Sequence, residues 1–269
     1  MTWTVGGATT RRYRAGMESA TDQAVVNRII EFLLPADDDV SGHLTGAREL
    51  TQPVTVLSEP WLEYVAGMKL SEPVRAGVQG ALGHIAAADN EVDRNMLTLL
   101  AGEADSGDEA RVASWFATMS WGAGPTNNFR VRQWRRSMEQ DNFLEVLGAT
   151  ARRVREGRLF DAHRGAWMPG TGEAFFTKWL WALGLPGIPG DVRPHVLDAR
   201  VWNSLAALGW SPKGRNASYR WVDYCIALDR WADAIRAEQL TWTVDGDGVE
   251  QLLFERRRNR TDFYSWTAK

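Results

Sequence analysis

Lys178 and Asp198 are the residues whose types and spacing suggest chemistry. Lys178 is the only charged residue in the otherwise largely apolar stretch 174–183, and Asp198 follows it by 20 residues. A helix that is apolar on every side is normally buried, and burial lowers the pKa of a lysine, giving a neutral amine that can act as a nucleophile. The same residue types also fit a lysine that snorkels to solvent and an aspartate that caps a helix.

A glycine-rich turn, Pro-Gly-Thr-Gly at 169–172, comes directly before the stretch with Lys178. Its two glycines permit a tight hairpin, and hairpin amides beside a helix N-terminus can bind a phosphate. Gly170, Thr171 and Gly172 are therefore candidates to bind a phosphate, such as one of a DNA backbone, although proline-glycine turns are common and the motif alone is weak.

Helical periodicity predicts the elements that position these residues. The lysine helix ends at Gly184, a second helix covers 198–208, and the segment 185–190 is the loop between them. Further helices are expected over 21–34, 73–88, 108–119, 141–156, 217–239 and 249–258. Residues 35–60 contain only short β-branched pieces such as Val54-Thr55-Val56-Leu57. The expected fold class is mostly α, with little β structure.

Charge divides the chain into two regions. Residues 1–110 contain 8 Lys and Arg against 17 Asp and Glu, and residues 111–269 contain 23 against 17. This asymmetry predicts an acidic, mainly helical N-terminal region at 1–110 and a basic helical region at 111–269 that carries the hairpin and the Lys/Asp pair. Within the basic region, four arginines form a candidate phosphate-binding strip: Arg130, Arg132, Arg135 and Arg136. A solvated arginine-rich face is the alternative.

Composition excludes several classes of site. Cys225 is the single cysteine, and the four histidines are scattered, so neither an internal disulfide nor a metal-ligand spacing is present. We expect no metal and no other cofactor. No apolar stretch has the length of a signal peptide or a membrane span, so we expect a cytoplasmic protein that does not use the membrane.

The hairpin and the segment around Asp198 together resemble a known superfamily. Residues 168–174 resemble the Leu-Pro-Gly-Val-Gly hairpin of helix-hairpin-helix DNA glycosylases, and residues 197–202 resemble the segment with their essential aspartate. In that superfamily the reactive lysine usually lies two residues after the second hairpin glycine, which is Ala174 here. Lys178 lies one turn further along the same helix face. This displacement is similar to that in archaeal and some bacterial 8-oxoguanine DNA glycosylase relatives. Some relatives act against phage with modified DNA. The resemblance covers about residues 165–240.

The resemblance implies a helix-hairpin-helix DNA glycosylase fold and a DNA N-glycosylase that acts on double-stranded DNA with a modified base. Such an enzyme extrudes its target nucleotide, because C1′ is shielded within the base stack. In the family mechanism, the amine of Lys178 would attack C1′ as the base leaves, and Asp198 would stabilise positive charge on the sugar. This covalent step allows AP-lyase cleavage. If Lys178 is too far from C1′, Asp198 would instead orient a water and leave an intact abasic site.

The sequence does not identify the base that would be excised. Oxidised guanine is suggested by the fold resemblance, and an enlarged base of phage DNA by the defensive relatives, with a slight preference for the phage base. Candidate walls of the base pocket, each of which also fits the protein core, are Trp179, Trp181, Trp202, Trp221 and Tyr224. Two other classes remain: a DNA-binding module without catalysis, and a helical protein unrelated to DNA. Protein partners are not indicated.

Overall fold

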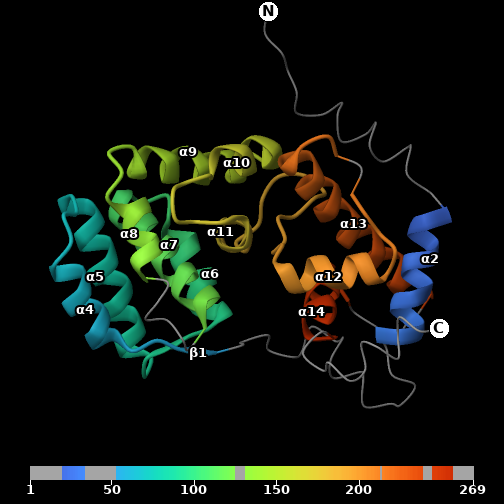
Figure 1. The fold of residues 1–269 in the computed structure, drawn as a ribbon, viewed down its shortest axis with the longest axis horizontal. Coiled ribbons are helices and arrows are strands. Elements are labelled where there is room, and N and C mark those ends of the chain that lie inside the picture. Colours follow the sequence, from blue (N-terminus) through green and yellow to red (C-terminus); the bar gives the residue numbers. More distant parts are fainter. Residues whose placement is uncertain (1–19, 34–52, 125–130, 213, 239–243, 257–269) are drawn as a thin grey trace, which may run out of the picture. The chain divides into compact units, whose positions relative to one another are not determined.

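The computed structural model describes residues 20–33, 53–124, 131–212, 214–238 and 244–256. Helices account for most of them, which confirms the predicted mostly α fold (Figure 1). The β-branched piece at 54–57 contributes strand β1 (Val54–Thr55), which pairs antiparallel with β2 (Glu91–Val92). Within the described part, no helix has the length and apolar character required to span a membrane.

The chain forms two compact units. The first contains 1–48, 199–215 and 223–269, and the second contains 49–198 and 216–222. The boundary at residue 110 that charge predicts between an acidic and a basic region stays a prediction. Lys178, Asp198 and the glycine-rich turn all lie in the second unit.

The second unit is built around one buried helix. Its helices are α4 (Ser58–Ala66), α5 (Glu72–Ala87), α6 (Arg94–Glu103), α7 (Asp108–Ala123), α8 (Val131–Met138), α9 (Phe143–Arg155), α10 (Leu159–Gly165) and α11 (Glu173–Gly184). Helix α7 packs against α5, α6, α9 and α11, and its residues 112–121 are all buried. Aromatic rings fill this core, where Trp61 stacks on Trp134 at 5.5 Å and meets Phe116 edge to face. The core thus fixes α11 from several sides.

The first unit consists of α2 (Ala20–Arg28), the π-helical turn η1 (Ile29–Leu33), α12 (Ala199–Ala207), most of α13 (Ala217–Glu238), and α14 (Gly246–Arg256). Helix α14 packs against α12. The contacts between them include a hydrogen bond from the Ser204 hydroxyl to the carbonyl oxygen of Leu253 at 2.6 Å, and the Arg200 guanidinium, which lies 4.8 Å from the Phe254 ring centroid.

Candidate active site

Lys178 and Asp198, the two candidate catalytic residues, lie together. Lys178 Nζ is 3.7 Å from Asp198 Oδ2, and both side chains are largely buried, with 11% and 14% of their surface exposed. A buried ammonium is costly unless it is paired and hydrogen-bonded, and the carboxylate offsets part of that cost. The Lys178 ammonium also lies 5.9 Å from the centroid of the Phe175 ring. An amine and a carboxylate therefore share one mostly dry site.

The Lys178 side chain extends back along its own helix. Its Nζ donates a hydrogen bond to the carbonyl oxygen of Ala174 at 3.1 Å. Long side chains on a helix generally point toward its N-terminus, so the amine is placed one turn before its own Cα. The reactive group of Lys178 consequently reaches the level of Ala174, near the hairpin.

Gly122, near the C-terminal end of α7, makes room for this side chain. A Cβ at Gly122 would lie 2.6 Å from Lys178 Cδ and 3.2 Å from Lys178 Cε. Ordinary van der Waals contact begins at 3.4 Å, so only glycine leaves the lysine stem its present path. The absence of a side chain at Gly122 thus leaves the space that the Lys178 stem occupies.

Thr177 connects α11 to the segment that carries Asp198. Its hydroxyl donates to the Glu173 carbonyl oxygen at 2.8 Å and accepts the backbone N–H of Leu197 at 3.2 Å. Thr177 is fully buried, and Leu197 directly precedes Asp198 in the chain. This hydrogen bond fixes the backbone beside Asp198 to the helix that carries Lys178.

The predicted hairpin is present as a tight turn before α11. Thr171 N–H donates to the Met168 carbonyl oxygen at 3.0 Å, and Gly170 has φ +87°, which corresponds to a type II turn after Pro169. A Cβ on Gly170 would collide with the backbone carbonyl oxygen of Gln133 in α8, so α8 lies directly against the turn.

Ser137 of α8 also anchors the hairpin. Its hydroxyl is 2.7 Å from the Pro169 carbonyl oxygen and 2.8 Å from the Thr171 hydroxyl. Because Thr171 is buried and both its hydroxyl and its amide have partners inside the protein, its side chain holds the turn together. Gly172 is exposed, and the predicted DNA contacts of Gly170, Thr171 and Gly172 stay predictions.

Two of the four arginine side chains in the predicted strip, those of Arg135 and Arg136, are among the described residues. Arg130 and the side chain of Arg132 lie outside the described residues. Arg136 is exposed, whereas Arg135 Nε is 2.8 Å from Glu139 Oε1. This hydrogen bond raises the pKa of Arg135 and is the largest cause of the lowered pKa of Glu139, although both groups are largely solvated. A phosphate would therefore compete with Glu139 for Arg135 but not for Arg136.

Most of the candidate pocket aromatics lie in the core. Trp179, Trp181, Trp221 and Tyr224 are at most 2% exposed, and Trp202 in the first unit is 40% exposed. Trp181 stacks on Trp121 at 5.4 Å, and the Arg94 guanidinium lies 4.6 Å from the Trp181 ring centroid. Trp221 donates its indole N–H to the carbonyl oxygen of His195. The contacts of Trp181 position α11 from within, and the role of the five aromatic residues as a base pocket stays a prediction.

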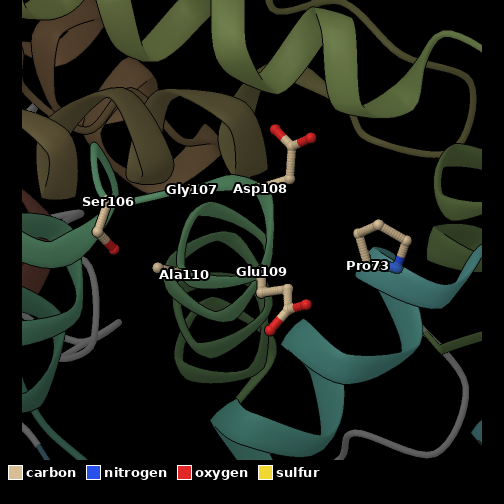
Figure 2. A pocket seen from close by; sticks show the side chains of 6 residues that line it. All are labelled: Pro73, Ser106, Gly107, Asp108, Glu109 and Ala110. Carbon is tan, nitrogen blue, oxygen red and sulfur yellow. The ribbon is translucent and has the colours of Figure 1, made fainter.

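An open hollow lies at the other end of α7. It is lined by Pro73, Ser106, Gly107, Asp108, Glu109 and Ala110 (Figure 2). Gly122 lies 14 residues after Asp108, or about 20 Å along the helix, so the hollow is remote from Lys178. Its two carboxylates would repel phosphates. In the part of the chain that the structure describes, no cluster of His, Cys, Asp and Glu side chains is arranged to hold a metal ion.

Gly122, Thr177 and Ser137 were absent from the set of site residues predicted from the sequence. Gly122 follows Trp121 in a buried helix, and Ser137 follows two arginines, so neither has a distinguishing local pattern. Thr177 offered a weak signal, because it is the only hydroxyl side chain within the apolar stretch around Lys178. Their importance follows from contacts that join distant segments.

Comparison with known protein families gives one match. The family model described as "Putative 8-oxoguanine DNA glycosylase OGG-like protein" matches residues 47–254, which include the hairpin, Lys178 and Asp198. Neither the search of curated proteins nor that of solved structures found a match. The matched range covers most of the chain and all of the site described above. The chain belongs to this 8-oxoguanine DNA glycosylase OGG-like family.

Proposed function

We propose that the protein is a DNA N-glycosylase that extrudes and excises a modified base, with Lys178 as the nucleophile and Asp198 as its charged partner. The observation that carries this proposal is the 3.7 Å separation between Lys178 Nζ and Asp198 Oδ2 in a largely buried site directly after a hairpin. Family membership supports the same activity.

The reaction requires an unprotonated amine. Lys178 Nζ would give a proton to the adjacent carboxylate of Asp198, and the neutral amine would then attack C1′ of the extruded nucleotide. The Nζ–C1′ bond forms as the glycosidic C–N bond breaks, and the base departs with that electron pair and takes up the proton from Asp198, which is then a carboxylate again. Asp198 stabilises the positive charge that develops on the sugar. Opening of the sugar ring gives a Schiff base, from which strand cleavage can follow.

The position of the amine favours this covalent route over a water attack guided by Asp198 alone. The family lysine usually occupies the position of Ala174, and Lys178 Nζ is 3.1 Å from the carbonyl oxygen of that residue. The lysine content also supports a dedicated role, because the chain has only four lysines: Lys69, Lys178, Lys213 and Lys269.

The substrate is proposed as either oxidised guanine or an enlarged base of phage DNA, the latter in antiphage defence. The test incubates the protein with duplexes containing 8-oxoguanine or other modified bases, and with phage DNA that has enlarged bases, and measures released base and abasic sites. Release of 8-oxoguanine without protection of cells against modified phage would reject the defence role. Binding without release from any substrate would instead identify a DNA-binding module.

A further inference from the structure

Trp167 is unusual among the tryptophans of the described residues. Its side chain is 68% exposed, whereas the next most exposed tryptophan, Trp202, is 40% exposed. An exposed indole presents a large flat apolar face on which a nucleic-acid base can stack. Within the described part of the chain, Trp167 makes no ring contact and no side-chain hydrogen bond.

The local backbone directs Trp167 outward. Helix α10 ends at Gly165, and the next three residues alternate in burial: Ala166 is 1% exposed, Trp167 is 68% exposed and Met168 is 3% exposed. Ala166 is the C-cap of α10 with αR backbone, and Met168 forms a β-bridge with Thr171 of the hairpin. These two buried residues anchor the segment in the core and hold the indole between them toward solvent, directly before the hairpin.

Basic side chains lie beside the segments on both sides of Trp167. Arg164 is exposed at the end of α10, and a Cβ on Gly165 would collide with the guanidinium of Arg153, which places that group beside the same backbone. Arg136 borders the hairpin from α8, because its Cβ would be 3.4 Å from a Cβ on Gly170. In the described residues, none of these three arginines has an acidic partner.

Two carboxylates lie near this segment. Asp161 lies 3.5 Å from Arg158, and Glu173, 44% exposed, lies 3.1 Å from the buried ring of His163. The three arginines Arg136, Arg153 and Arg164 outnumber them, so the surface that they make with Trp167 has a net positive charge and one flat aromatic group. An aromatic ring among phosphate-binding cations is the combination with which proteins hold an unstacked base of a nucleic-acid strand.

We propose that Trp167 stacks on a base of the DNA strand that the hairpin holds, next to the extruded nucleotide, and that Arg136, Arg153 and Arg164 bind the phosphates around it. This inference rests on the proposed function and adds a stacking residue to it. Extrusion of one nucleotide leaves neighbouring bases without a stacking partner, and an indole can replace part of that lost stacking. The turn that follows the indole is bonded to α8 through Ser137, and its Gly170 lies close to the Gln133 backbone.

The test measures affinity for a duplex with a central tetrahydrofuran abasic-site analogue and for the intact duplex of the same sequence. Fluorescence anisotropy gives both dissociation constants without any reaction. We expect Trp167→Ala to weaken binding of the abasic duplex by about 5- to 100-fold, the range of one base stack, and to weaken binding of the intact duplex less. Trp167→Phe should restore most of the affinity. Leu99→Ala removes another exposed apolar side chain, 55% exposed on α6, and serves as the matched control.

A second readout separates stacking from charge. Trp167→Ala should leave the dependence of affinity on salt unchanged, whereas Arg164→Gln should reduce the slope of log K against log salt by about 0.9. A Trp167→Ala protein that binds the abasic duplex within twofold of wild type overturns the inference, and base release by that variant at the wild-type rate leaves the proposed function standing. Failure of the wild-type protein to bind either duplex overturns both. Loss of affinity in Trp167→Ala without base release by wild type supports the stacking residue and rejects the glycosylase.

Discussion

Replacing Gly122 with alanine should separate activity from stability. The added Cβ would lie 2.6 Å from Lys178 Cδ, about 0.8 Å inside the 3.4 Å at which ordinary contact begins. Its 3.6 Å distance to Phe175 Cδ1 is ordinary contact, so the lysine stem is the group that must move. Because that stem is a flexible chain, the protein can accommodate the methyl group by displacing the amine.

Stability and reaction rate should respond differently to this substitution. Gly122 lies within α7, where alanine is favoured over glycine by about 0.5–1 kcal/mol in a helix, so the free energy of unfolding should be unchanged or slightly higher. A displacement of the nucleophile by about 1 Å can reduce a reaction rate about 100-fold. We therefore expect Gly122→Ala to melt at or above the wild-type temperature and to form the Schiff base about 100-fold more slowly.

The assay uses a duplex with a natural abasic site, whose C1′ aldehyde reacts with an amine whatever the original base. Single-turnover trapping with borohydride at saturating protein gives the rate, and thermal unfolding gives the stability. Gly83→Ala is the matched control, since this glycine lies in helix α5 and a Cβ there meets nothing within 4 Å. Trapping by Gly122→Ala at the wild-type rate would refute the argument that Gly122 positions Lys178.

Three further substitutions test the surrounding structure. Thr177→Val leaves the buried amide of Leu197 without its partner, so unfolding should require about 1–3 kcal/mol less, measured by urea denaturation, and excision should slow as the Asp198 segment loosens. Gly170→Ala forces a side chain into φ +87° and should destabilise by at least about 1–3 kcal/mol in the same measurement. Arg136→Ala should reduce the salt slope of DNA binding by about 0.9, whereas Glu139→Gln should increase it by releasing its arginine partner, as titrations at several salt concentrations would show. Equal slopes in all proteins would remove α8 from the interface.

The lysine helix, the hairpin and the helix after Asp198 could be predicted because their signals are local. The stretch 174–183 is apolar with one charge, the turn contains proline and two glycines, and glycines follow both helices. The observed bounds of α11 and α12 agree with these predictions within two residues. The proximity of Lys178 and Asp198 could be predicted only from the family resemblance. Their separation along the chain does not determine whether the segment with Asp198 folds back against the lysine helix.

The rest of the site depends on contacts between distant segments. Gly122 and Lys178 are 56 residues apart in the sequence, and Ser137 is 32 residues from Pro169. Helix α8 was missed because its arginines obscure a short apolar face, from which Trp134 and Met138 enter the core. The exposure of Trp167 could not be predicted from the sequence either. A tryptophan between alanine and methionine is expected in the core, and only the burial of both neighbours in the structure shows that it points to solvent.

The central claim is that Lys178 is the amine that forms the covalent bond with DNA. The direct measurement is borohydride trapping on abasic and modified-base duplexes, followed by mass spectrometry of the adduct, for wild type, Lys178→Gln and the control Lys69→Gln. We predict an adduct at Lys178 in wild type and in Lys69→Gln, and none in Lys178→Gln, which should also lose base excision. An adduct on another amine, or base excision by Lys178→Gln at the wild-type rate, would contradict this account and leave Asp198 with a water molecule as the catalytic group.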